Sequence, residues 1–342
     1  MFSRRQFLYT LATTLLVVAA INGVLALVAH RTLPRRLMKR ITESTSAEVV
    51  AVGNSLIVAG FDEKSFDAAA GIPPSNAAAN IGLGASSPVE QMLLYRYAIA
   101  NGMRPRVLVY GFFDFQLTDP VTMTNADLIG NRAILYYLEP EFGRRFYRLP
   151  THDAVVFEAM RFFPMFVYRG AVWSKVEQFR RFLGQQGFPR QQTNEFGRAS
   201  DFSLLEAKSA AKFTEQCNSS LSSALTSPVE ELFREAHAAG VSIVVVEMPM
   251  SPYHRKTFYS SEAWPAYAAH ARALVSQYDA TFIDASDWIP DRTSFYDNLH
   301  LNPAGKGEFS RRLGELLQKD VSLQATEGGA RFSSAAARKN AP

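Results

Sequence analysis

Hydrophobic positions along this chain form one long apolar run near the N-terminus and several short runs separated by amphipathic stretches. The long run, Phe7 to Ala29, contains no charged residue. At 1.5 Å per residue, a helix of this length can cross a hydrocarbon core of ~30 Å. Basic residues flank the run on both sides: Arg4 and Arg5 before it, and Arg31, Arg35, Arg36, Lys39 and Arg40 after it. We therefore expect an uncleaved signal anchor over residues 1–30, a membrane span at 7–29 and a basic linker at 31–46.

Two sequence signals disagree about the orientation of this anchor in the membrane. The stretch Ser3 to Leu8 begins Ser-Arg-Arg and resembles a twin-arginine export signal. The more basic C-terminal flank would remain in the cytoplasm by the positive-inside rule. Val24-Leu25-Ala26 is only a weak cleavage site. We expect a single-pass protein of the cell (inner) membrane with an extracytoplasmic, periplasmic domain.

The short apolar runs predict buried strands that alternate with helices. Strands are expected at Val49–Val52, Val107–Tyr110, Ile243–Val246 and Thr281–Ile283, and helices at 88–101, 228–239, 262–277 and 303–317. Continuous apolar strands are typical of a parallel sheet covered on both faces. The pattern predicts an α/β fold, a three-layer α/β/α sandwich with a mainly parallel, flavodoxin-like sheet, over residues 47–320.

The stretch from about 120 to 225 lacks valine-rich strand runs and is rich in Phe, Tyr and Arg. We interpret it as a mainly helical insertion. Its aromatic side chains either line an acyl or glycan pocket, as a lid would, or pack the insertion onto the core. Residues 321–342 are small and polar, which predicts a disordered tail.

Composition narrows the function classes. The net charge is +4, and much of the basic excess flanks the apolar run, so we expect no nucleic-acid partner. Cys217 is the single cysteine, and neither zinc-ligand spacing nor an HExxH motif occurs. Gly82-x-Gly84 lacks the third glycine of a dinucleotide loop. We expect no cofactor and no metal.

Two segments at opposite ends of the predicted domain suggest nucleophilic catalysis. Ser55 follows a buried strand and Gly53, at the carboxyl edge of the sheet where α/β proteins bind ligands. Asp297 precedes His300 by three residues in a loop before a helix, so the carboxylate can orient the imidazole, which can accept the serine proton. Taken separately, each has a structural alternative: a serine that caps a helix, and a loop histidine beside a solvated aspartate.

Taken together, the segments resemble the SGNH/GDSL hydrolase superfamily over about residues 47–115 and 240–317. Gly53-Asn54-Ser55 stands where the family has G-D-S, and Asp297 to Gly305 matches its D-x-x-H block and the N/P/G-rich stretch that follows. Asn80 to Ser86 occupies the place of its second block. The resemblance implies a catalytic triad of Ser55, Asp297 and His300. It also implies an oxyanion hole formed by Ser55 and Gly84, with Gly82 as the alternative.

The third block of the family, G-x-N-D, is altered here. Gly111-Phe112-Phe113-Asp114 has phenylalanine in place of the asparagine whose side chain completes the oxyanion hole. Asn54, Asn80 and Ser86 are candidates for the missing donor, and Asn54 and Asn80 are also candidates for substrate contact. Asp114 binds substrate or caps local structure, and His254, on the loop after a strand, contacts substrate or is an ordinary loop histidine.

The resemblance implies a serine esterase or O-acyltransferase that forms an acyl-Ser55 ester. Membrane-anchored members of the superfamily include cell-envelope acyl-transfer and exopolysaccharide O-acetylation proteins. We therefore expect an acylated small molecule or an acylated envelope or exported glycan as substrate, and partner proteins in an envelope complex. The alternative is a non-catalytic, glycan-binding component of such a complex, which Phe113 favours and the retained Ser55, Asp297 and His300 oppose.

Overall fold

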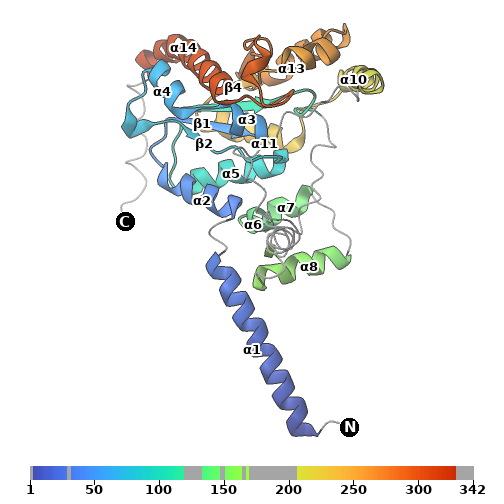
Figure 1. Ribbon diagram of the computed structural model, residues 1–342. Helices are drawn as coiled ribbons and strands as arrows, with labels where there is room; N and C mark the ends of the chain where they lie inside the picture. Colours follow the sequence, from blue (N-terminus) through green and yellow to red (C-terminus); the bar gives the residue numbers. More distant parts are fainter. Residues whose placement is uncertain are drawn as a thin grey trace, which may run out of the picture.

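The computed structural model describes residues 3–28, 32–118, 133–146, 151–163, 167–168 and 206–328. Within these residues an all-parallel, five-stranded sheet has the order β2-β1-β3-β4-β5 (Figure 1). The strands are β1 (Val49–Gly53), β2 (Ala79–Asn80), β3 (Val107–Phe112), β4 (Ser242–Glu247) and β5 (Thr281–Asp284). This is the 2-1-3-4-5 order of flavodoxin-like sheets, whose topological switch point lies between β1 and β3.

Alternate strand residues feed two separate cores. Val50 and Val52 of β1 belong to one hydrophobic cluster, and Val49 and Ala51 belong to the other, as the period of two along a strand requires. The first cluster includes α2 (Leu33–Glu43), α5 (Pro88–Ala100), α11 (Ser227–Ala238) and, beside β5, α13 (Ala263–Ser276). The second includes α3 (Ser55–Gly60), α4 (Glu63–Ala70) and α14 (Pro303–Gly328). The predicted three-layer α/β/α fold is confirmed.

The predicted strands and helices of this domain all appear, with ends shifted by a few residues except at the last helix, α14, which extends well beyond its predicted end. Local signals account for the precision at α5: Pro88 opens the helix, and Ser87 and Glu90 form a reciprocal capping box. The sequence did not predict β2, which is only two residues long and carries no apolar run. It pairs with Val50 and Ala51 of β1 through the backbone.

Two segments differ from the sequence interpretation. The expected basic linker is helical over most of its length, because Leu37, Met38 and Ile41 lie on one face of α2 and are buried beside α5. The expected disordered tail begins as helix, since α14 continues to Gly328. Residues 321–328 include Leu, Gln, Ala and Glu, which favour helix. Residues 329–342 lie outside the described part of the chain.

The N-terminal helix α1 (Arg4–Val28) extends away from the domain (Figure 1). Among the described residues, it is the one helix long and apolar enough to cross a membrane, and none of its apolar window is buried within the protein. The described parts of the predicted insertion are helices α6 (Ala133–Tyr136), α7 (Pro140–Phe146), α8 (Thr151–Phe162) and α10 (Glu206–Ser220). The rest of the insertion lies outside the described residues, and both the domain limits and the lid stay predictions.

Candidate active site

Ser55 lies at the switch point of the sheet. It is the first residue of α3 and follows Gly53, the last residue of β1. A Cβ atom on Gly53 would come within 2.7 Å of the Gly111 backbone oxygen and 2.6 Å of Ile57 Cγ1. Glycine is therefore needed where α3 turns back across the ends of β1 and β3. Asn54 caps α3 by accepting a 2.9 Å hydrogen bond from the Leu56 N–H.

The structure brings Ser55, His300 and Asp297 into direct contact. His300 Nε2 lies 2.9 Å from Ser55 Oγ, and His300 Nδ1 lies 2.7 Å from Asp297 Oδ2. The side chains of His300 and Asp297 are 16% and 8% exposed. A nucleophile, a base and a carboxylate that orients the base thus form a chain of hydrogen-bond contacts that is partly shielded from water.

Asp297 is held as a carboxylate in this arrangement. Its Oδ1 atom accepts hydrogen bonds from the Leu299 N–H at 2.8 Å and the His300 N–H at 2.7 Å. Burial by itself raises the pKa of Asp297, but the hydrogen bonds from the His300 side chain and from the two backbone groups outweigh burial and lower it. An ionised Asp297 fixes the imidazole so that Nδ1 carries a proton and Nε2 faces Ser55 as the acceptor.

The two candidate glycines of the oxyanion hole differ in their surroundings. The Gly82 N–H donates a 3.0 Å hydrogen bond to Asn80 Oδ1, so it is engaged in the turn after β2. Gly84 lies directly against the nucleophile, since a Cβ atom on it would be 4.0 Å from Ser55 Cβ. Of the two glycines, Gly84 is therefore the one shown beside Ser55, and the Gly82 N–H is already engaged.

Two of the three candidates for the missing donor have structural partners that occupy their donor groups. Asn80 Nδ2 donates to the backbone oxygens of Ile57 and Phe61, both at 3.0 Å. Ser86 Oγ donates to the Gly53 backbone oxygen at 3.2 Å. Phe113 itself packs against the hydrophobic cluster that includes α3. Neither Asn80 nor Ser86 is placed to stabilise a developing oxyanion.

Asn54, the third candidate, leads to a residue that the sequence did not single out. Asn54 Nδ2 donates a 3.2 Å hydrogen bond to Oε1 of Gln116, a buried residue in the turn after β3. This contact places the side chain of Gln116 beside the turn that carries Ser55. The relationship depends on the tertiary fold across 62 residues, so no local pattern in the sequence marks it.

Asp114 and His254 lie together at the ends of β3 and β4. His254 Nε2 is 3.1 Å from Asp114 Oδ1, and the Tyr259 hydroxyl donates to the same oxygen at 2.8 Å. Asp114 has a backbone φ of 49°, an uncommon conformation for a residue other than glycine. These contacts engage both side chains with each other, so a role in substrate contact stays a prediction.

Glu247, at the end of β4, is a buried carboxyl group that the sequence did not reveal as special. It is 0% exposed, and neither carboxylate oxygen has a hydrogen-bond partner within the described residues. Burial raises the pKa of Glu247 well above its usual value, and the neighbouring carboxylates Asp284 and Asp114 raise it further. The Tyr259 hydroxyl, which is near but outside hydrogen-bond geometry, lowers the pKa by less than burial raises it. A neutral carboxylic acid is the form that this environment favours.

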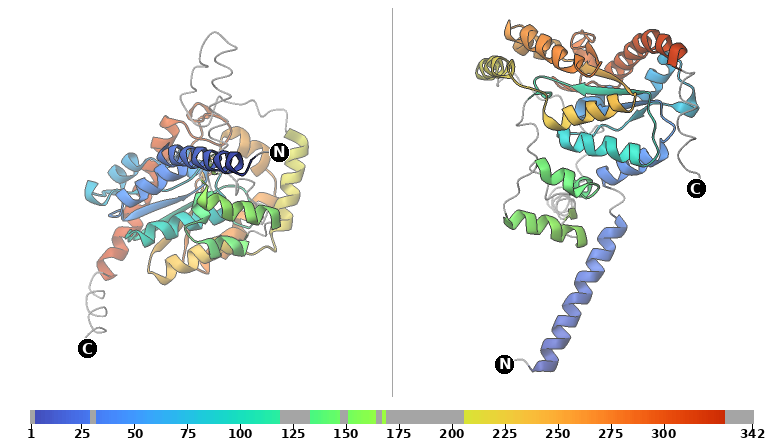
Figure 2. Two further views of the ribbon diagram at one scale, coloured as in Figure 1. Left: turned by 90° about the horizontal axis from the view of Figure 1, so that it is seen from below. Right: turned by 180° about the vertical axis from the view of Figure 1, so that it is seen from behind.

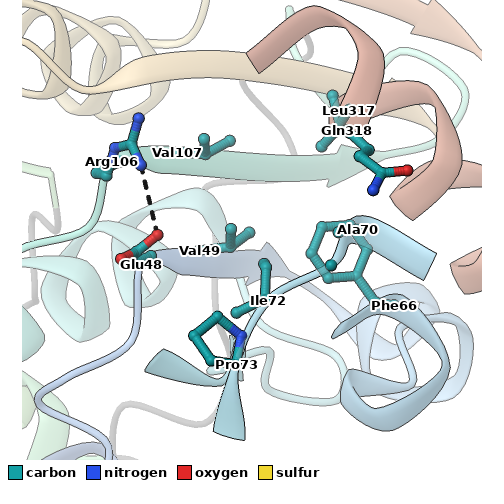
Figure 3. A pocket seen from close by; sticks show the side chains of 11 residues that line it. Glu48, Val49, Phe66, Ala70, Ile72, Pro73, Arg106, Val107, Leu317 and Gln318 are labelled. Atoms are coloured by element: carbon teal, nitrogen blue, oxygen red, sulfur yellow. Dashed lines mark ion pairs between the residues drawn. The ribbon is translucent and has the colours of Figure 1, made fainter. Parts of the chain in front are cut away.

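Two cavities lie at opposite edges of the sheet. The cavity in Figure 3 has a volume of about 300 Å³ and includes Val49 and Val107, the first residues of β1 and β3. An ion pair of 3.5 Å between Arg106 and Glu48 borders it (Figure 3). It therefore lies at the amino edge of the sheet, away from Ser55 at the carboxyl edge.

The second cavity, of about 460 Å³, lies at the carboxyl edge beyond β4 and β5. Tyr259 and Trp264 stack on one another at 3.8 Å in its wall, and polar and charged residues form much of the rest: Arg255, Lys256, Ser260, Asp284, Ser286 and Asp287. The Ser251 N–H donates to the Asn298 backbone oxygen at 3.3 Å and so joins its border to the loop of His300.

No group of His, Cys, Asp or Glu side chains among the described residues is arranged to hold a metal ion. Comparison with known proteins gave no matching family model and no matching curated protein. Among solved structures, one match is to a protein of Bacteroides fragilis described as a "putative acylhydrolase". It has 10% sequence identity and a TM-score of 0.35, and the alignment covers 81% of this chain and 86% of that one. A match at this level does not define a family.

Proposed function

We propose that this protein is a serine esterase or O-acyltransferase that works through an acyl-Ser55 intermediate. The observation that supports the proposal is the continuous contact from Ser55 Oγ to His300 Nε2 and from His300 Nδ1 to Asp297. It is the arrangement that acyl transfer to a serine requires, and it lies at the switch point of a parallel sheet. The SGNH-like motifs named above agree with it.

In the first half of the reaction, Ser55 Oγ attacks the carbonyl carbon of an ester while its proton passes to His300 Nε2. The tetrahedral intermediate then collapses, and the alcohol leaves with that proton. In the second half, water or an acceptor hydroxyl attacks the acyl-Ser55 ester and gives its proton to His300. Ser55 is regenerated when it takes that proton back. Water yields hydrolysis and a hydroxyl acceptor yields transfer.

Three donors are proposed for the oxyanion: the N–H groups of Ser55 and Gly84 and the side-chain amide of Gln116. As the first residue of α3, Ser55 has an N–H without an acceptor inside its helix. In this proposal Gln116 takes the role of the family asparagine that is Phe113 here. Asn54 donates a hydrogen bond to the side-chain oxygen of Gln116 and so fixes its amide group. Donors fixed in advance in this way lower the cost of developing charge.

The substrate we propose is an acylated polysaccharide or small molecule of the cell envelope. Two features support it: the apolar helix α1, which fits a membrane anchor, and the resemblance to membrane-anchored acyl-transfer proteins. The polar cavity beside the loop of His300 has the mixed donors, acceptors and stacked aromatic wall that suit a sugar. Attachment of the domain outside the inner membrane, together with partner proteins of an envelope complex, belongs to the same proposal.

Turnover of a simple acetyl ester, p-nitrophenyl acetate, by the purified full-length protein tests this function. We expect Ser55→Ala to remove turnover. Ser276 provides a matched control, because it is exposed on α13, lies outside both cavities, and donates its hydroxyl to the Ala273 backbone oxygen. Ser276→Ala should retain full activity. Equal turnover by the wild type and Ser55→Ala would reject the proposal.

A second candidate function is glycan binding without catalytic activity. Phe113 supports it, because this phenylalanine stands where the SGNH-like pattern has the asparagine that donates to the oxyanion. The two candidates differ in the effect of Ser55→Ala on function in cells. If the Ser55→Ala protein supports normal acylation of the envelope, the binding function is correct and the catalytic one is wrong.

A further inference from the structure

Among the described residues outside α1, large hydrophobic side chains that face water are concentrated on and beside α8. Phe162 is 74% exposed and Val155 is 65% exposed, and Phe163 is 42% exposed. Phe162 and Val155 lie seven residues apart and so share one face of the helix. The opposite face carries Phe157 and Met160, which are buried in the core cluster that includes α5. The buried face fixes α8 to the domain, and Val155 and Phe162 are exposed on its other face.

The helix α8 lies on the side of the domain from which α1 leaves. Figure 1 and the right view of Figure 2 place it at the level where α1 meets the domain, and it runs crosswise to α1. In the view from below, α1 and the helices α6–α8 all face the viewer (Figure 2). Leu33, the first residue of α2 and 42% exposed, is also at this end of α1.

Exposed basic side chains accompany these apolar ones. Arg35, Arg36 and Lys39 lie on the outer face of α2, whose inner face is buried against the core. Arg161 is exposed beside Phe162. Apolar side chains that are flanked by Arg and Lys match the boundary of a bilayer, where acyl chains give way to phosphate groups.

We propose that α8 and the outer face of α2 form a docking surface for the anionic phospholipid bilayer that α1 crosses. Phe162 and Val155 enter the acyl-chain boundary, and the basic groups of α2 contact lipid phosphates. The proposal depends on the membrane anchor proposed above and is independent of the catalytic activity. It gives the domain two attachments to the membrane, so that the carboxyl edge of the sheet keeps a fixed orientation above the surface.

Site-directed fluorescence in vesicles tests this docking surface in the full-length chain. The native Cys217 is buried, and burial raises its pKa to about 12, so thiol reagents leave it unlabelled. Single cysteines are introduced as Phe162→Cys, as Leu15→Cys within α1, and as Leu316→Cys, a 36% exposed position on α14. Each is labelled with a nitrobenzoxadiazole dye and reconstituted in phosphatidylcholine–phosphatidylglycerol vesicles with or without doxyl-labelled lipid.

We expect doxyl lipid to remove most of the fluorescence at positions 15 and 162 and to leave position 316 unchanged. Quenching at 15 without quenching at 162 would overturn the docking surface and retain the anchor. No quenching at either position would overturn both. If position 162 is instead protected by a second copy or a protein partner, its dye will escape the lipid quencher, which also contradicts the proposal.

The basic face provides a second test with its own control. Quenching at position 162 should weaken when phosphatidylglycerol is omitted and should weaken equally in the triple variant R35Q/R36Q/K39Q. A control variant at exposed basic residues of α14, R311Q/K319Q, should behave as the wild type. Quenching that is unaffected by both the anionic lipid and the triple substitution would contradict the proposed phosphate contacts.

Discussion

Ser55 Oγ and His300 Nε2 lie 2.9 Å apart although 245 residues separate them in the chain. The contact forms because Ser55 follows β1 and the loop of His300 follows β5, and all parallel strands end at the same edge of the sheet. Asp297 extends it by a further contact of 2.7 Å.

Loss of His300 should lower catalytic activity about as much as loss of Ser55. We expect His300→Ala to lower kcat/KM for an acetyl ester by about 10⁴-fold or more, and Ser55→Ala combined with His300→Ala to cost no more than either alone, because such residues act as a unit. Asp297→Asn should cost up to about 10⁴-fold by favouring the wrong tautomer of His300. Additive losses in the double variant would show that the pair does not act together.

We expect Gln116 to contribute to the rate of the chemical step, in addition to its structural contact with Asn54. We expect Gln116→Leu, which removes the amide donor, to lower kcat by about 10²–10³-fold with little change in KM. Gln116→Glu retains the oxygen that accepts from Asn54 and loses the donor, so it should be as slow as Gln116→Leu. Normal kcat in Gln116→Glu would show that the oxygen, and not the donor, is what the site needs.

Glu247 should make folding stability depend on pH. Because its pKa is raised in the folded protein, the folded state holds a proton that the unfolded state releases above the ordinary value of 4.5. The free energy of unfolding of the wild type should therefore decline, relative to Glu247→Gln, as pH rises from about 4.5 toward the raised pKa. Thermal unfolding at a series of pH values measures this difference.

The control for this prediction is Glu43→Gln, since the Glu43 side chain is 61% exposed on α2. Its unfolding midpoint should follow that of the wild type at every pH. A Glu247→Gln protein that is less stable than the wild type at neutral pH would mean that the buried carboxylate is ionised and paired.

The orientation in the membrane can be measured with an alkaline phosphatase fused after the C-terminus, because that reporter folds only outside the cytoplasm. We expect an active fusion, with the domain after residue 40 on the outer side. The residues Arg35, Arg36 and Lys39 favour the opposite orientation by charge alone. An inactive fusion at normal expression would place the domain inside and exclude exported glycans as substrates.

The sequence was sufficient for those features that depend on local patterns. Buried β-branched runs such as Ile243 to Val246 identify strands, and Pro88 with its capping box marks the start of a helix. Asp297 and His300 are three residues apart, so their contact is also local. Ser55 could be singled out because a strand and Gly53 precede it.

The features that escaped prediction depend on the three-dimensional fold or on competing signals. Gln116 is close to the site only because Asn54 meets it from another strand end. Glu247 is the last residue of an apolar strand, and the neighbouring sequence does not indicate that both of its carboxylate oxygens are buried. In α2 the basic residues obscured the helical spacing of Leu37 and Ile41, which the structure shows to be buried.

The measurement that tests the central claim most directly is identification of the residue that a fluorophosphonate probe modifies in the full-length protein. Such a probe reacts with a serine whose hydroxyl is activated by a base, and peptide mass mapping locates the adduct. We expect a single adduct on Ser55 that disappears in His300→Ala and persists in Ser276→Ala. An intact, folded protein that gains no adduct on Ser55, or gains it equally in His300→Ala, would contradict an acyl-serine mechanism.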